Sequence, residues 1–141
     1  NEAYTSTFNT EKYYLSISDY ISSIKKSLPT TSILLTAPPD TRSKNRYPRN
    51  NDSIISVFKN ISNAKNVAFW DLRSQMGGDG SLFKWLKSGL ASKDQLHFTK
   101  EGYETQAKML CEALFIEYNK TLPPAEYISL PIFQNHISNL R

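Results

Sequence analysis

The stretch SILLTAPP, residues 32–39, is a short apolar run that contains two β-branched residues and is stopped by Pro38 and Pro39. An apolar run of this length between turn residues predicts a buried strand, here from Ser32 to Ala37. A second run of the same kind, NVAFWDL at residues 66–72, predicts a second strand.

Helical periodicity flanks both strands. Apolar residues spaced three or four apart predict a helix from Glu11 to Leu28, which Pro29 ends. Between the strands, Asn51 or Asp52 can cap a second helix. Its inner face is expected to carry Ile54, Ile55, Phe58 and Ile61.

The chain after the second strand begins with RSQMGGDGS, residues 73–81, which holds three of the five glycines and predicts a turn. A short helix is expected from Ser81 to Ser88, ended by Gly89. A long helix follows from Thr99, its expected N-cap, to about Asn119. Its buried stripe is expected to contain Tyr103, Ala107, Leu110, Leu114 and Tyr118, with Cys111 beside it as a small buried hydrophobe. The tail from Thr121 is expected to be irregular.

The alternation of helices and strands is typical of an α/β fold with a parallel sheet. Two strands are too few for such a sheet, because parallel strands need several neighbours and cover on both faces. Either the apolar pattern fails to reveal further strands, or the sequence is part of a larger domain whose beginning is absent.

Composition limits the classes of function. The chain has 141 residues, of which 39% are hydrophobic and 21% charged, as expected for one globular domain without a membrane span. The net charge of +4 is concentrated in the loop at residues 42–49, through Arg42, Lys44, Arg46 and Arg49. This basic loop could contact a polyanion, but it lacks a nucleic-acid motif and a basic helix, so a solvated surface loop is the simpler interpretation.

Asp94 and His97 form the pattern with the clearest chemical meaning. An aspartate three residues before a histidine, in a loop entering a helix, can direct its carboxylate at Nδ1 and leave Nε2 free as a general base. Alternatively, Asp94 is a local cap and His97 an ordinary polar residue. A metal pair is a weaker alternative, because no further His or Cys lies at ligand spacing.

A triad also needs a nucleophile, and none is evident. There is no G-x-S-x-G motif, Ser81 lies at an expected helix N-cap, and Cys111 is expected to be buried in a helix.

The segment KDQLHFTKEGYE, residues 93–104, resembles the last sequence block of the SGNH (GDSL-type) hydrolases, and residues 69–103 resemble the branch with peptidoglycan and polysaccharide O-acetylesterases. The resemblance implies an α/β, flavodoxin-like doubly wound parallel sheet of which residues 1–120 are the C-terminal half, followed by a tail at 121–141. It implies that Asp94 is the orienting acid and His97 the base. NEAYTSTFNTEKYY looks like the block that supplies the oxyanion asparagine, which would be Asn1.

The same resemblance implies an esterase that acts on an acylated carbohydrate, requires no cofactor or metal, and is periplasmic, at the cell surface or secreted. The family's serine and its oxyanion glycine should lie upstream of Asn1, so this chain alone should be inactive and would have the N-terminal half of the domain as its partner. The alternative function is a non-catalytic binding domain that uses the basic loop.

Two further pairs have open roles. Asp71 and Arg73, at the end of the second strand, could contact substrate or stabilise the loop. Trp70 and Trp85 could stack on a sugar but lie on apolar faces, which favours the core.

Overall fold

The computed structural model describes residues 2–44 and 46–127. The chain divides into two compact units, Asn1–Arg73 and Ser74–Arg141. The expected boundary between a half-domain at 1–120 and a tail at 121–141 is a different division, and it stays a prediction.

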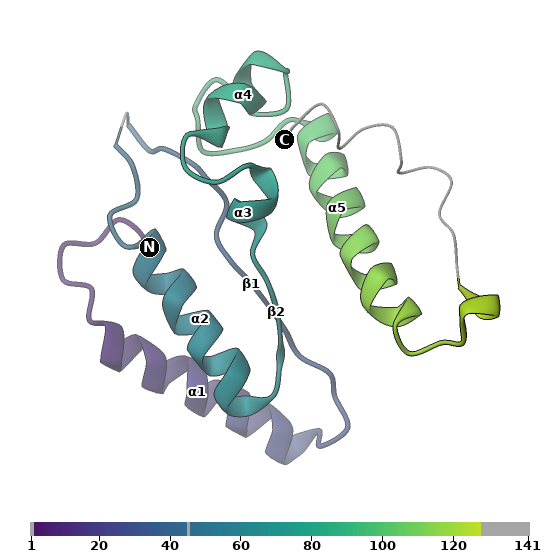
Figure 1. The fold of residues 1–141 in the computed structure, drawn as a ribbon. Helices are drawn as coiled ribbons and strands as arrows, with labels where there is room; N and C mark the ends of the chain where they lie inside the picture. Colours follow the sequence, from purple (N-terminus) through teal and green to yellow (C-terminus); the bar gives the residue numbers. More distant parts are fainter. Residues whose placement is uncertain (1, 45, 128–141) are drawn as a thin grey trace. The chain divides into compact units, whose positions relative to one another are not determined.

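The first unit contains two helices and two parallel strands (Figure 1). They are α1 (Thr10–Ser27), β1 (Leu34–Thr36), α2 (Asn51–Lys65) and β2 (Ala68–Trp70). Leu34, Leu35 and Thr36 pair in register with Ala68, Phe69 and Trp70. The order and parallel direction predicted from the sequence are therefore confirmed for this strand pair, whereas a complete doubly wound sheet goes beyond these two strands.

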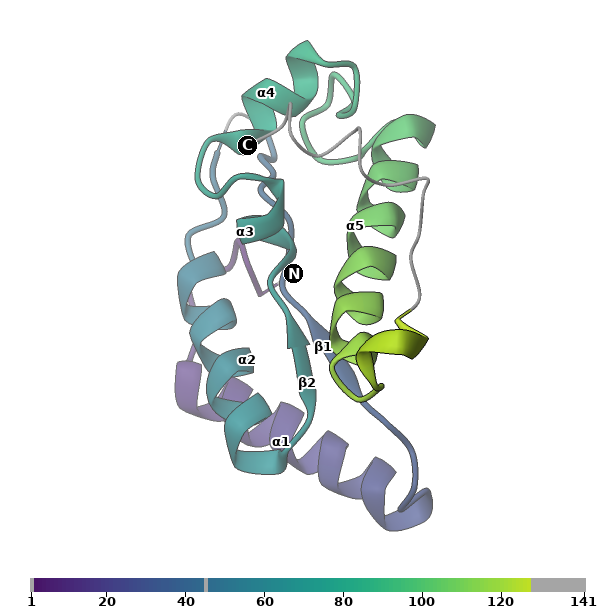
Figure 2. The ribbon, with the colours of Figure 1, turned by 45° about the vertical axis from the view of Figure 1, so that its right-hand side comes forward.

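Helices α1 and α2 pack together, as both ribbon views show (Figures 1 and 2). Between them lies a core of buried aliphatic side chains, Ile21, Val57, Ile61 and Val67. Leu35 and Ile33 pack against this core from the strand side. The apolar periodicity of both helices thus becomes one continuous core, since burial of apolar surface is the main force that holds such elements together.

Strand burial differs from the expectation. Leu34 is 37% exposed and Thr36 is exposed as well, while Leu35 between them is half-buried. A strand is buried on both faces only when other elements cover both. The apolar run identified the strand but could not show which of its faces would be covered. Among the described residues of the first unit, the strand packs against the core formed with α1 and α2.

Helix α1 is capped by Asn9, whose side chain accepts a hydrogen bond from the Lys12 N–H at 2.8 Å. At the far end, the Nζ of Lys25 donates to the carbonyl oxygens of Lys65 and Asn66, at 2.7 and 3.3 Å. A cation at a helix C-terminus satisfies free carbonyl groups, so Lys25 ties the end of α1 to the end of α2.

Two helix boundaries correct the sequence predictions. Asn50 occupies the N-cap position of α2 without a side-chain capping hydrogen bond, and the expected caps Asn51 and Asp52 are the first two helical residues. The turn expected at residues 73–81 begins with a five-residue helix, α3 (Leu72–Met76), before the glycines start.

The second unit contains α4 (Ser81–Lys87), α5 (Lys100–Asn119) and a 3-10 turn at Pro124–Glu126. Gly80 caps α4, so Ser81 is the first helical residue rather than the cap that the sequence suggested. Thr99 caps α5 as predicted, and its Oγ1 accepts a hydrogen bond from the Gly102 N–H at 3.1 Å.

The stripe expected on α5 is largely exposed: Tyr103, Leu114 and Tyr118 are each about half exposed. Cys111 is exposed as well, contrary to the prediction of a buried thiol. The helical period identifies which residues share a face, but it carries no information about what covers that face. Among the described residues, no helix is both long and apolar enough to cross a membrane.

Candidate active site

Asp94 and His97 contact each other directly. Oδ2 of Asp94 lies 2.6 Å from Nδ1 of His97, a short distance that is typical of a charge-assisted hydrogen bond. With the proton on Nδ1, the imidazole donates to the carboxylate and Nε2 is left as an acceptor. Within residues 2–44 and 46–127, Nε2 has no hydrogen-bond partner. This is the geometry of a histidine prepared to accept a proton.

The other carboxylate oxygen of Asp94 holds the loop. Oδ1 accepts hydrogen bonds from the backbone N–H groups of Leu96 and His97, both at 3.0 Å. Asp94 therefore orients the His97 side chain with one oxygen and its backbone with the other. The two interpretations left open by the sequence, a local cap and an acid that orients a base, describe the same carboxylate.

This arrangement lowers the pKa of Asp94 to about 2, from an ordinary value of 3.8. The largest cause is the side-chain hydrogen bond from His97, followed by the backbone N–H groups of His97 and Leu96. Both side chains are accessible, with 51% of Asp94 and 65% of His97 exposed. The carboxylate thus stays ionised over the pH range in which a histidine titrates.

The loop that carries the pair is closed at its base. Ala91 and Phe98 form an antiparallel bridge, and the Ser92 N–H donates to the His97 carbonyl at 2.9 Å. Gln95 adopts a left-handed conformation with φ of 63°, which turns the chain between Asp94 and His97. The residues between Ala91 and Phe98 therefore form a compact loop rather than an extended connection.

Aromatic packing anchors the loop to the two helices beside it. Phe98 is buried and meets Trp85 of α4 edge-to-face, with ring centroids 5.5 Å apart. It also meets Tyr103 of α5, with centroids 5.7 Å apart. Trp85 is completely buried, and its Nε1 donates to the Met76 carbonyl. The position of His97 next to Phe98 is thereby fixed by the core of the second unit.

Trp70 and Trp85 are both core residues, at 9% and 0% exposure, as the apolar faces indicated. A role in stacking on a sugar does not fit side chains buried to this extent.

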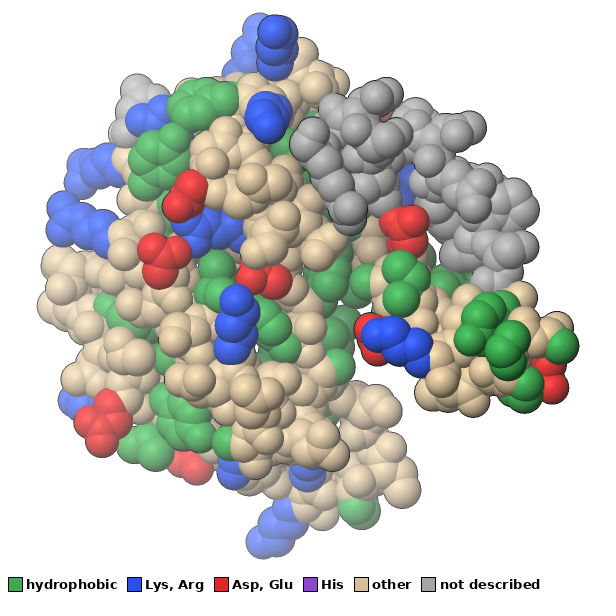
Figure 3. Space-filling view, viewed as in Figure 1, with side chains coloured by type: hydrophobic (Ala, Val, Ile, Leu, Met, Phe, Trp, Pro, Cys, Tyr) green, Lys and Arg blue, Asp and Glu red, His purple; other side chains and the backbone are tan. Residues whose placement is uncertain are grey.

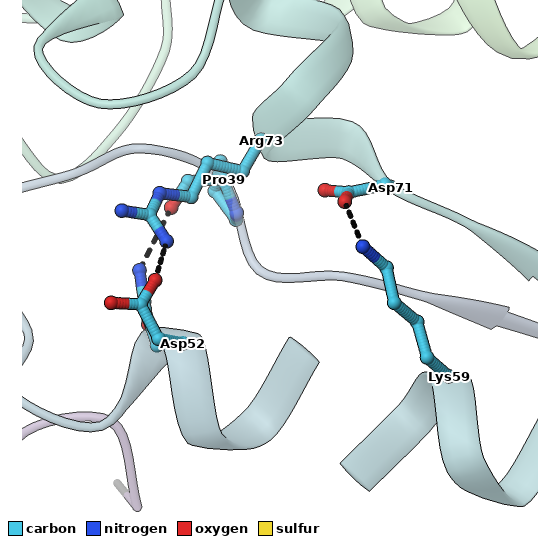
Figure 4. Close-up of polar contacts among 6 residues, drawn as sticks. Pro39, Asp52, Lys59, Asp71 and Arg73 are labelled. Atoms are coloured by element: carbon cyan, nitrogen blue, oxygen red, sulfur yellow. Dashed lines mark hydrogen bonds and ion pairs between the residues drawn. The ribbon is translucent and has the colours of Figure 1, made fainter. Parts of the chain in front are cut away.

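Asp71 and Arg73 are held by side chains of α2 (Figure 4). Asp71 lies 3.5 Å from Nζ of Lys59, and Arg73 contacts the Asp52 carboxylate at 2.5 Å. The Arg73 side chain is only 13% exposed. Of the two roles that the sequence left open, these contacts favour stabilisation of the chain after β2.

The glycine turn also has a structural explanation. Gly78 and Gly80 have φ values of 79° and 77°, and an added Cβ would meet no atom within 4 Å at either position. These positions therefore need the conformational freedom of glycine rather than its small size. This supports the interpretation as a tight turn.

The remaining candidates from the sequence are Ser81, Asn1 and a metal site. Ser81 is 2% exposed, which does not suit a nucleophile. Asn1, the expected oxyanion donor, lies outside the described residues. Among the described residues, no group of three or more His, Cys, Asp or Glu side chains is arranged to hold a metal ion.

Comparison with solved structures shows what the chain is similar to. The structure is similar to an esterase over most of its length. That esterase is a peptidoglycan O-acetylesterase, with a TM-score of 0.79 and 27% sequence identity. The similarity covers 86% of this chain and 36% of the esterase chain, so the chain spans little more than a third of that protein. No family model and no curated protein matches the sequence.

Proposed function

We propose that this chain carries the acid and the base of a serine esterase of the SGNH type, which removes O-acetyl groups from a carbohydrate such as peptidoglycan. The observation that carries this proposal is the Asp94–His97 contact of 2.6 Å in a loop anchored by core residues. The similarity to a peptidoglycan O-acetylesterase supports the acetylated substrate.

In the proposed reaction, Nε2 of His97 takes the proton of a serine hydroxyl while the serine oxygen attacks the ester carbonyl. The tetrahedral intermediate then expels the sugar alkoxide, which receives that proton from His97. Asp94 remains ionised throughout and stabilises the imidazolium. In the second half, His97 activates a water molecule that hydrolyses the acetyl-serine and releases acetate.

Asn1 is proposed as a donor to the oxyanion of both tetrahedral intermediates. Removal of one such donor typically lowers the rate by roughly 100- to 1,000-fold. The serine and the glycine that complete the site are proposed to lie upstream of Asn1, in the N-terminal half of the same domain. Residues 1–141 alone should then be inactive.

The polymer that carries the acetyl group suggests where the protein acts. Peptidoglycan and surface polysaccharides lie outside the cytoplasmic membrane, so we propose that the enzyme is periplasmic, at the cell surface or secreted.

The test is hydrolysis of p-nitrophenyl acetate by the full-length protein that contains these residues. His97→Ala should lower kcat by about 1,000-fold or more, because the serine loses its base. The matched control is His136→Ala, since His97 and His136 are the two histidines of the chain.

The control should retain activity. Equal activity of His97→Ala and the unchanged protein would contradict the role of His97. A folded, unchanged protein that hydrolyses neither this ester nor acetylated peptidoglycan would contradict the esterase proposal itself.

A further inference from the structure

The first unit contains a hollow of about 390 Å³ that has no part in the proposed ester chemistry. Its walls come from two segments far apart in the sequence. Tyr4 and Ser6 form one side, and the loop residues Ser43, Lys44, Arg46, Tyr47 and Arg49 form the other. We refer to these residues together as the basic pocket. Its volume falls within the roughly 300–1,000 Å³ that is usual for small-ligand sites.

The loop side of the basic pocket has a defined shape. Ser43 and Arg46 exchange two backbone hydrogen bonds, at 3.0 and 2.9 Å, which close a tight turn. Lys44 in this turn has a φ of 49°, a conformation that non-glycine residues seldom adopt. Lys44 and Arg46 therefore belong to the same hydrogen-bonded turn.

The other side is fastened to the loop by Asn50. Its Nδ2 donates to the carbonyl oxygens of Glu2 and Thr5, at 2.7 and 2.8 Å, and its backbone N–H donates to Ala3 at 3.1 Å. Asn50 is also the cap of α2, so the segment around Tyr4 is tied to the start of a helix. The two walls are thus held together by direct contacts.

The charge of the basic pocket is not neutralised within the described residues. Lys44, Arg46 and Arg49 form no ion pair there with an acidic side chain, in contrast to Arg73, which pairs with Asp52. Lys and Arg side chains gather on the side where this loop lies (Figures 1 and 3). Three like charges around one hollow favour an anion there over an empty site, because an anion relieves their mutual repulsion.

Two aromatic rings border these charges. Tyr47 is 46% exposed, and the Arg42 guanidinium lies 4.6 Å from its ring centroid. Cation–π contact of this kind restrains the ring, and nearly half of Tyr47 stays exposed. Tyr4 is half-buried, and its hydroxyl lies 3.5 Å from Oγ1 of Thr41. Rings combined with hydroxyl groups suit a sugar, which offers both apolar C–H faces and hydroxyls.

We propose that the basic pocket binds a sugar unit that carries an anionic group, either phosphate or carboxylate. The cations would hold the anionic oxygens through charge-assisted hydrogen bonds, and Tyr47 and Tyr4 would contact the ring. A nucleic acid is a poorer fit, since phosphates in series need a basic stripe or helix, whereas these cations line one side of a single hollow. This inference does not rest on the proposed esterase activity.

The test is isothermal titration calorimetry on the full-length protein with four probes: glucose 1-phosphate, glucuronate, inorganic phosphate and glucose. We expect glucose 1-phosphate or glucuronate to bind at least about tenfold more tightly than glucose, because only the charged sugars engage the cations. Comparison of the two charged sugars distinguishes phosphate from carboxylate. Inorganic phosphate should bind more weakly than glucose 1-phosphate, because it has no ring to contact the tyrosines.

The variants Arg46→Gln/Arg49→Gln should weaken binding of the preferred charged sugar by about tenfold or more. The matched control is Lys26→Gln/Lys87→Gln, which removes the same charge from two exposed positions outside the basic pocket. The control should change the affinity less than about twofold, since it alters only net charge. Circular dichroism would confirm that both variants are folded.

Three results would overturn the proposal. One is the absence of heat from all charged sugars at millimolar concentrations. Another is equal weakening in the two double variants, which would indicate net charge rather than a site. The third is binding of single-stranded oligonucleotides in strong preference to both charged sugars. Because the assay measures binding, its failure leaves the esterase test unaffected, and failure of the esterase test leaves this one unaffected.

Discussion

Asp94 engages His97 with both of its carboxylate oxygens: Oδ2 meets the imidazole Nδ1 at 2.6 Å, and Oδ1 accepts the His97 backbone N–H at 3.0 Å. One side chain thus sets the position of the His97 backbone and the orientation of its ring. Substitutions at Asp94 should separate these two effects, because an amide keeps an oxygen for the backbone but loses the negative charge.

Asp94→Asn should lower kcat of the full-length protein by roughly 100- to 10,000-fold, because an uncharged partner does not stabilise the imidazolium and can favour the wrong tautomer. Asp19→Asn, at an exposed carboxylate of α1, is the matched control and should be neutral. Steady-state kinetics with p-nitrophenyl acetate measures both. If Asp94→Asn keeps more than half of the activity, Asp94 is only a loop cap.

The Asp94 pKa provides a test without substrate. A carboxyl carbon titration by NMR should place it at about 2, below the ordinary 3.8. In His97→Ala the value should rise only part of the way, because the backbone N–H groups of Leu96 and residue 97 still donate to Oδ1. A folded-state pKa below the ordinary value means that ionised Asp94 favours the folded loop above about pH 4 and that this contribution is lost as the pH falls toward 2. An unchanged pKa in His97→Ala would show that the side-chain contact is absent in solution.

Gly102→Ala should destabilise the protein although alanine is the better helix former. An added Cβ would lie 1.9 Å from the Leu90 carbonyl oxygen and 3.1 Å from Cβ of Phe98. We expect a loss of about 1–3 kcal/mol in the free energy of unfolding, against a gain of about 1 kcal/mol from propensity alone. Chemical denaturation measures whether the free energy of unfolding falls or rises. A stabilised variant would mean that Leu90 and α5 do not approach this closely.

Residues 1–141, expressed alone, should not unfold cooperatively. The described strands form one parallel pair, and two strands give little independent stability. Exposed apolar side chains such as Leu34, Leu114 and Ile116 should promote aggregation. Scanning calorimetry and light scattering provide the readouts. A single sharp transition of a monomer would contradict the proposal that the sheet is completed by an upstream half.

The sequence predicted the features that depend on local pattern. The order of α1, β1, α2 and β2 follows from apolar periodicity, and the Thr99 cap from its side chain. The Asp94–His97 contact was also predictable, because three residues of separation at a helix entrance leave the two side chains within reach. Features set by residues a few positions apart can be predicted without knowledge of the rest of the fold.

Other features required information that local pattern lacks. Helix α3 is too short to show a period, and the exposure of Cys111 depends on what covers α5. Tyr4 joins the basic pocket through contacts across 37 residues, as its hydroxyl near Thr41 shows. The sequence placed positive charge in the loop but gave no sign that a distant tyrosine faces it.

The bridge between Ala91 and Phe98 has a consequence for folding and evolution. All contacts that join Asp94 to His97 lie within this short span, so the pair can form as soon as the loop closes, with little loss of chain entropy. Delivery of a serine to Nε2 would instead require segments from distant parts of a chain to assemble. The proposed acid and base are therefore joined by local contacts, and the step that depends on distant segments is their alignment with the proposed nucleophile.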